Sequence, residues 1–192
     1  MSPLKILVRW IEEERANGVA FPNGAVLGTT SYTGQPRTRM LGTHFDEWGN
    51  PRFHTTPQSR KVLDLRNNKQ ASLTFALQRS LRSVSLEGQV APLTQEELSS
   101  DWHALDTEFR RSYLVFGGRS GQPLSSSSEL NLARQELPED SELEMPDTFI
   151  GFKFEVVERV AFYSVGNLDF AEHVTYSYKI KSKTWIAQNV VP

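Results

Sequence analysis

Residues 53–68 of this chain read FHTTPQSRKVLDLRNN, a short strand pattern that passes through a turn into a short helical pattern. Ser59 stands where a helix N-cap is expected, and Arg60 and Lys61 follow it in the first helical turn. Two cations at this end are unfavourable, because the free N–H groups of a helix N-terminus already carry partial positive charge. A bound anion, most often a phosphate, would balance that charge. The alternative is that both side chains extend into solvent, at a penalty of roughly a few tenths of a kcal/mol.

Three further side chains could complete an anion site at this point. Arg39 lies on one predicted strand, and His54 and Thr55 end the next one, just before the helix. If the two strands pair, guanidinium, ammonium, hydroxyl and backbone N–H donors would converge on one phosphate. Each residue taken alone could equally be a solvated strand residue, so it is the combination that points to phosphate.

Outward from this stretch, short apolar runs alternate with turn residues, which is typical of an antiparallel β protein. Strand patterns recur from 25 to 91 and from 149 to 191, beginning with a hairpin of 25–32 and 37–45. Helices are predicted over 4–18, 59–66, 94–113 and 129–137, the third of them opened by a capping box of Thr94 and Glu97. We expect six or seven antiparallel strands with peripheral helices: a mainly β barrel with α decoration, within the α+β class.

The composition indicates one globular domain of 192 residues, with 38% hydrophobic and 23% charged residues. We divide it into an N-terminal helix (1–18), barrel strands with the phosphate site (24–91), a helical and loop segment (94–145) and C-terminal strands (148–192). A net charge of −2 gives no footprint for nucleic acid. The first residues lack the apolar run of a signal peptide, and no long apolar segment follows, so we expect a cytoplasmic protein that does not bind membranes.

Several classes of site are disfavoured by what the sequence lacks. It has no cysteine, which excludes disulfides, thiolate metal sites and cysteine nucleophiles. Its four histidines do not form a metal-binding pair beside a glutamate, so we expect no metal. It also has no Gly-x-Ser-x-Gly elbow, no Gly-x-Gly-x-x-Gly fingerprint and no Walker loop.

Taken together, several segments resemble the pyridoxamine 5′-phosphate oxidase family, flavoproteins with an FMN-binding split β-barrel. The segments that carry the resemblance extend over nearly the whole chain and include 3–10, 22–30, 34–39, 45–49, 53–68, 71–75, 87–88, 146–152 and 185–192. The strongest is 53–68, which looks like the family's phosphate-binding Ser-Arg-Lys block.

The resemblance implies a homodimer with two FMN molecules at its interface. One subunit would hold FMN through Arg39, Met40, Leu41, His44, His54, Thr55, Ser59, Arg60 and Lys61, with Ser83 near the flavin ring. The other subunit would contribute Gln122, Tyr163 and His173. Glutamine, tryptophan and arginine are usual in the family where this chain has Ser83, Tyr163 and His173.

The sequence departs from the family where the vitamin B6 phosphate would bind. The family signature Arg-Leu-His-Asp-Arg is replaced at 169–173 by Asp-Phe-Ala-Glu-His, and Asp169 would repel a substrate phosphate. The lysine expected after the second strand is Thr43 or His44. Residues 110–112 (Arg-Arg-Ser) could imitate a second phosphate clamp, but at a different spacing. We therefore expect the FMN site to persist and the vitamin B6 phosphate site to be lost.

The leading hypothesis is an FMN-dependent oxidoreductase that acts on a small molecule other than pyridoxamine phosphate, with no catalytic side chain assigned. A genuine pyridoxamine or pyridoxine 5′-phosphate oxidase with an altered substrate grip is the second hypothesis. A non-catalytic flavin- or haem-binding protein is the third, because fold resemblance does not settle activity. A structural protein without cofactor is the remaining alternative.

Overall fold

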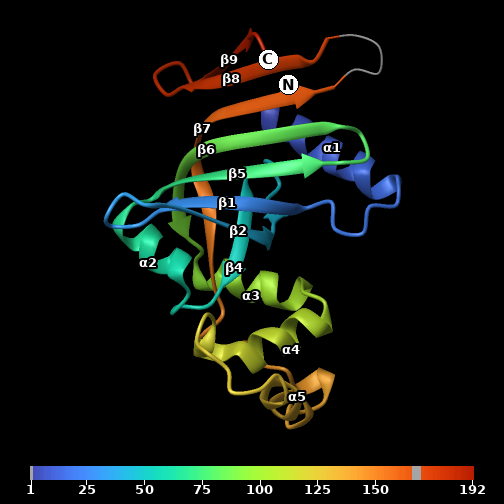
Figure 1. The fold of residues 1–192 in the computed structure, drawn as a ribbon, viewed down its shortest axis with the longest axis vertical. Coiled ribbons are helices and arrows are strands. Elements are labelled where there is room, and N and C mark those ends of the chain that lie inside the picture. Colours follow the sequence, from blue (N-terminus) through green and yellow to red (C-terminus); the bar gives the residue numbers. More distant parts are fainter. Residues whose placement is uncertain (1, 166–169) are drawn as a thin grey trace.

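Strands of the described chain form one antiparallel sheet that curls on itself, with helices around it (Figure 1). The structure is a computed structural model that describes residues 2–165 and 170–192. The strands are β1 (Gly24–Thr30), β2 (Pro36–Gly42), β3 (His44–Phe45), β4 (Pro51–Thr55), β5 (Gln70–Leu77), β6 (Arg82–Pro92), β7 (Ile150–Ser164), β8 (Glu172–Lys179) and β9 (Thr184–Asn189). The helices are α1 (Pro3–Ala16), α2 (Arg60–Asn67), α3 (Gln95–Ala104), α4 (Thr107–Phe116) and α5 (Ser128–Gln135), with 3-10 turns at Gly117–Arg119 and Asp140–Glu142.

The long strand β7 divides the sheet into two parts. The strands follow the order β2-β1-β5-β6-β7-β4-β3, and β8 also pairs with β7 and carries β9 on its far side. On the side of β7 away from β6, residues 150–153 pair with β4 and residues 159–164 pair with β8. The lower part curls until β2 contacts β4, while the β8–β9 hairpin extends the upper part (Figure 1). This curl places β2, β4 and the start of α2 side by side.

The core fills the concave side of the curled sheet. In β5 every second residue is buried, as expected for a strand with one face toward the core. Helix α1 contributes Leu4, Leu7 and Ile11, which are almost fully buried. A second, smaller cluster around Trp102 and Phe149 joins α3 to the strands. The helix pair α3–α4 is thereby held against the open end of the curl (Figure 1).

The predicted elements are largely present, with three corrections. The described chain has nine strands rather than six or seven. The strand expected over 37–45 breaks at Thr43, where the chain leaves its pairing with β1, marked by the bonds of Thr43 to Asn23, and pairs as β3 with β4. The helix expected over 94–113 is two helices, because Asp106 caps a new one by accepting from the N–H of Glu108. The capping box of Thr94 and Glu97 is confirmed.

None of the helices that the structure describes is both long enough and apolar enough to cross a bilayer.

Gly88 permits a close backbone approach between β6 and β7. It lies at a register shift of the pair, where a Cβ atom would come within 2.0 Å of the Val156 carbonyl oxygen. We expect Gly88→Ala to lower the free energy of unfolding by about 3 kcal/mol, because backbone cannot move aside as a side chain does. Urea unfolding measures the loss. The control is Gly28→Ala, whose methyl group would meet only the rotatable Ser72 hydroxyl, at 2.5 Å. Equal losses in the two variants would contradict this explanation.

Candidate functional site

A cavity of about 380 Å³ lies between β2, the start of α2 and residues 120–121. We call it the cationic cavity, since four of the residues that line it are basic: Arg37, Arg39, Arg60 and Lys61. The arginines of β2 are two residues apart, so both side chains leave the same face of the strand. Arg60 and Lys61 come from the first turn of α2, as the sequence predicted. Sheet and helix therefore direct their cations into one space.

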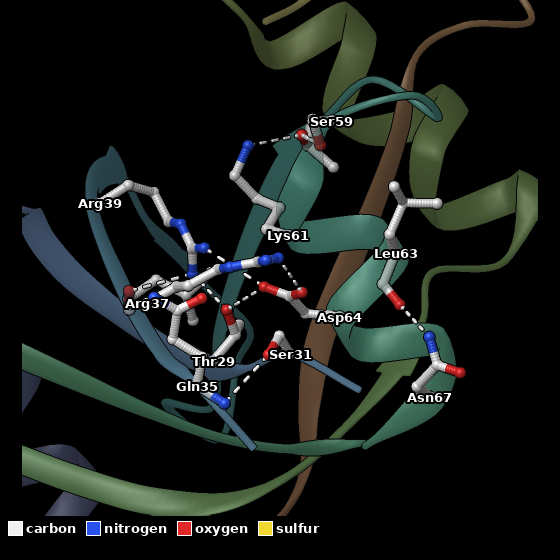
Figure 2. Close-up of polar contacts among 12 residues, drawn as sticks. Thr29, Ser31, Gln35, Arg37, Arg39, Ser59, Lys61, Leu63, Asp64 and Asn67 are labelled. Atoms are coloured by element: carbon white, nitrogen blue, oxygen red, sulfur yellow. Dashed lines mark hydrogen bonds and ion pairs between the residues drawn. The ribbon is translucent and has the colours of Figure 1, made fainter. Parts of the chain in front are cut away.

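A buried carboxylate holds the two arginines of β2 in place (Figure 2). Asp64 of α2 is 2% exposed, and its Oδ1 accepts a hydrogen bond of 2.7 Å from Arg37 Nη1. Its Oδ2 accepts from the Thr29 hydroxyl at 2.8 Å and lies 3.6 Å from Arg39 Nη2. Arg39 Nη1 also donates to the Thr29 hydroxyl, at 2.7 Å. One carboxylate thus faces two guanidinium groups and leaves the cavity with excess positive charge.

Lys61 is partly buried and, among the described residues, contacts a hydroxyl group rather than a carboxylate. Its Nζ donates to the Thr55 hydroxyl at 3.0 Å, and the Thr55 hydroxyl bonds to that of Ser59 at 2.9 Å. Burial of the ammonium, and then repulsion from Arg39, lower the pKa of Lys61 below its usual value. A bound anion would reverse both effects, because it supplies a partner for the charged form.

Ser59 corrects one detail of the sequence prediction. It occupies the N-cap position of α2, but its hydroxyl makes no capping hydrogen bond and contacts Thr55 instead. The Val62 N–H donates to the Ser59 carbonyl, so the backbone N–H groups of Arg60 and Lys61 are the ones available to an anion at this end of the helix. Helix donors, two hydroxyl groups and several cations are the donor set that holds a phosphate monoester. The residues present thus fit the phosphate of the FMN that the resemblance implies.

A second cavity of about 380 Å³ lies farther along β2, between the sheet and the helix pair α3–α4. We call it the apolar cavity, because its walls are mainly Phe21, Leu41, Leu105, Phe109 and Tyr113. Its polar lining consists of Asn23, His44, His54 and Asp106. Burial raises the pKa of Tyr113 to about 12, so its phenol stays protonated at neutral pH.

His54 belongs to the apolar cavity and not to the anion cluster, where the sequence analysis placed it with Thr55. Consecutive strand residues point to opposite faces, so these two side chains cannot meet on one side of β4. His54 Nε2 lies 2.8 Å from Asp101 Oδ2, and its ring stacks on Phe149 at 4.7 Å. Arg52 Nη2 holds the other oxygen of Asp101 at 2.9 Å. Because a carboxylate accepts hydrogen bonds and does not donate them, we place a proton on Nε2 of His54, which donates to Asp101.

The other predicted site residues fall in three places. The Met40 side chain lies on the face of β2 opposite to that of Arg39, and it is 65% exposed. Ser83, Tyr163 and His173 are cross-strand neighbours on β6, β7 and β8, away from the elements that line either cavity. Ser83 is therefore grouped with Tyr163 and His173 rather than with Arg39.

Gln122 donates to Gln58 Oε1 of the same chain at 3.3 Å, next to the cationic cavity. The resemblance assigned it to the partner subunit. Of the replaced signature at 169–173, Asp169 lies outside the described residues.

Several residues that shape these cavities were not predicted from the sequence. Arg37 could have been found from the two-residue period of β2, which puts it on the same face as Arg39. Asp64 had no local signal, because its partners Arg37, Arg39 and Thr29 lie on β1 and β2. The contributions of Leu105 and Phe109 had no such local signal, since they depend on how α3 and α4 dock. Among the described residues, no group of three or more His, Asp or Glu side chains is placed to hold a metal ion.

Comparison with known proteins gives a consistent picture. The sequence model described as pyridoxamine 5′-phosphate oxidase matches residues 11–134. A pyridoxine/pyridoxamine 5′-phosphate oxidase of Bordetella pertussis (strain Tohama I) is 34% identical over 125 residues, which cover 65% of this chain. That match spans only 58% of the relative's own length.

Two solved structures share the fold over the whole of this chain. The crystal structure of PhzG from Burkholderia lata 383, in complex with tetrahydrophenazine-1-carboxylic acid, has a TM-score of 0.83 at 19% identity and is covered to 93%. A pyridoxamine 5′-phosphate oxidase-related, FMN-binding protein from Nostoc punctiforme PCC 73102 has a TM-score of 0.83 at 15% identity and is covered to 98%. At these identities the likeness establishes the fold alone, and it confirms the predicted split barrel.

Proposed function

Because this chain belongs to the pyridoxamine 5′-phosphate oxidase family, we propose that it binds FMN through the cationic cavity and acts as an FMN-dependent oxidoreductase. The observation that carries the proposal is the convergence of Arg39, Arg60 and Lys61 on one cavity, with the Ser59 and Thr55 hydroxyls beside them. Burial removes water from around the Lys61 ammonium. A phosphate dianion would supply a counter-charge for it.

The chain's own residues would bind and orient the cofactor. Arg60, Lys61 and the N–H groups of α2 would hold the phosphate, and Asp64 with Thr29 would keep Arg39 turned toward it. FMN, when bound, supplies hydride acceptance and transfer. Beyond Arg39, the same face of β2 leads to Leu41 and the apolar cavity, so a substrate could lie there beside the cofactor.

We propose a homodimer as the working form. Ser83, Tyr163 and His173 form a group on β6–β8 that is separate from the cationic cavity. A flavin held by one subunit would meet this group most simply on a second copy of the chain. Sedimentation of the FMN-saturated protein at micromolar concentration should give the mass of two chains, and a single-chain mass would contradict the dimer.

The relatives named pyridoxine/pyridoxamine 5′-phosphate oxidase support a second candidate, oxidation of a vitamin B6 phosphate by this chain. We favour a different substrate, because Asp169, Ala171 and His173 stand where the family carries its substrate-gripping Arg, His and Arg residues. Turnover of pyridoxine 5′-phosphate by FMN-saturated protein would establish the second candidate.

The central test is whether purified protein takes up FMN. We expect a yellow protein whose flavin, released by denaturation, is FMN at one molecule per chain, since the cationic cavity would hold one phosphate. Riboflavin, which lacks the phosphate, is the matched control and should bind about a hundredfold more weakly, because it loses the charge-assisted contacts. Equal affinity for FMN and riboflavin would show that the cavity does not hold the phosphate.

A further inference from the structure

The apolar cavity has the features of a small-molecule site. Its volume of about 380 Å³ lies in the usual range of roughly 300–1,000 Å³ for such sites. Aromatic and aliphatic side chains come from both sides: Phe21 and Leu41 from the sheet side, and Leu105, Phe109 and Tyr113 from the helix pair. Flat aromatic rings stack well against walls of this kind.

The charges around this cavity are the opposite of those around the cationic one. None of its described lining residues is Lys or Arg. Its one carboxylate, Asp106, already accepts the N–H of Glu108 and would repel an anion. Arg52 lies behind His54 and is held by Asp101. A phosphate dianion placed here would be desolvated without a cationic partner, which is strongly unfavourable.

His44 and His54 supply the polar contacts. Their rings lie 5.2 Å apart, between centroids, in the wall of the cavity. Burial, followed by repulsion from His54, lowers the pKa of His44, so at neutral pH its imidazole is uncharged. An uncharged imidazole can donate one hydrogen bond and accept another, which suits a hydroxyl or carbonyl group on a ring.

We propose that the apolar cavity binds a planar aromatic compound that carries a hydroxyl or carbonyl group and no phosphate. The proposal rests on the proposed function, because this compound would be the one presented to FMN. Arg39 and Leu41 are two residues apart on one face of β2, about 7 Å along the strand, so the two cavities are neighbours. The phosphate of the cofactor and the ring of the substrate would thus be recognised by separate parts of one strand.

Two probes that differ only in a phosphate test the proposal: 1-naphthol and 1-naphthyl phosphate. Binding is measured by equilibrium dialysis on the FMN-saturated protein, so that the cationic cavity is occupied. We expect 1-naphthol to bind at least about tenfold more tightly than its phosphate ester, since only the ester brings an unpaired charge into the cavity. Equal or tighter binding of the ester would overturn the proposal.

Phe109 and Phe116 provide a matched pair of variants on α4. Phe109 lines the cavity and is 56% exposed, while Phe116 is 43% exposed and does not line it. We expect Phe109→Ala to weaken 1-naphthol binding about tenfold, through the lost ring contact, and Phe116→Ala to leave it unchanged. Phe109→Lys should reverse the preference in favour of the phosphate ester, whereas Phe116→Lys should not. Equal behaviour of the two positions would overturn the assignment of the cavity.

The test separates this inference from the proposed function. FMN uptake is read independently from visible absorbance, and inorganic phosphate can fill the cationic cavity if FMN does not bind. If 1-naphthol still binds in a Phe109-dependent manner without FMN uptake, the cavity assignment stands and the proposed function fails. If FMN binds but 1-naphthol does not, the proposed function stands and this inference is wrong.

Discussion

Replacing Arg60 and Lys61 together with alanine should weaken FMN binding by at least about a hundredfold. Each cation is placed to make a charge-assisted contact with the phosphate, and two such contacts contribute about 3 kcal/mol or more, which corresponds to that factor. The fold should persist, because Arg60 is exposed and Lys61 makes one hydrogen bond, to Thr55. Titration of flavin fluorescence measures the affinity, and urea unfolding checks the fold.

The matched control removes one arginine from the last turn of the same helix and one lysine from just beyond its end. Arg66 and Lys69 are both exposed at the C-terminal side of α2, so Arg66→Ala with Lys69→Ala changes the net charge equally. We expect this control to bind FMN within about threefold of wild type, because exposed and distant charges are largely screened by salt. If both double variants lose affinity equally, the effect comes from overall charge and the phosphate site lies elsewhere.

Replacing Asp64 with alanine should lower the free energy of unfolding by about 3 kcal/mol. Removing one partner from a buried ion pair usually costs about 3–5 kcal/mol, because the remaining charge stays desolvated. The lower value is expected here, since the Arg37 and Arg39 side chains keep 26% and 20% exposure and can partly reach water. The Thr29 hydroxyl also loses its acceptor. Urea unfolding without added phosphate measures the loss.

Asp64→Asn separates charge from volume, because it keeps the size of the side chain and one acceptor oxygen. We expect Asp64→Asn to show most of the decrease in the free energy of unfolding that Asp64→Ala shows. Saturating inorganic phosphate should stabilise Asp64→Asn more than it stabilises wild type. The anion would take over as counter-charge for the two arginines and would bind the folded state only. Wild-type stability of Asp64→Asn would show that the carboxylate charge plays no part.

The fold class was predictable because its signals are local. Alternating apolar residues in 71–77 and 83–91, turn residues between the strands and the capping box at Thr94 all act over a few residues. The errors arose where a local pattern met a tertiary contact. The strand over 37–45 broke at Thr43 because the chain changes its pairing partner there, from β1 to β4. The helix over 94–113 broke where Asp106 could cap a second helix.

The geometry of the predicted cluster was foreseen in part. Arg39 and Lys61 do line one cavity and Lys61 bonds to Thr55, but the two strands do not pair as expected: β2 pairs with β1, β4 pairs with β7, and the curl of the sheet brings β2 to β4. His54 bonds to Asp101 on the other side of β4, because adjacent strand residues face opposite sides.

By itself the sequence determined the family, the split barrel and the pair of cations at the start of α2, because motifs and hydrophobic periods are written along the chain. The tertiary structure alone decided two other features. It placed the Asp64 carboxylate of α2 against the Arg37 and Arg39 side chains of β2. It also closed an apolar cavity between β2 and the helix pair α3–α4, from residues as distant as Phe21 and Tyr113. A cavity of this kind forms only when separate segments pack together, so no local sequence pattern could have predicted it.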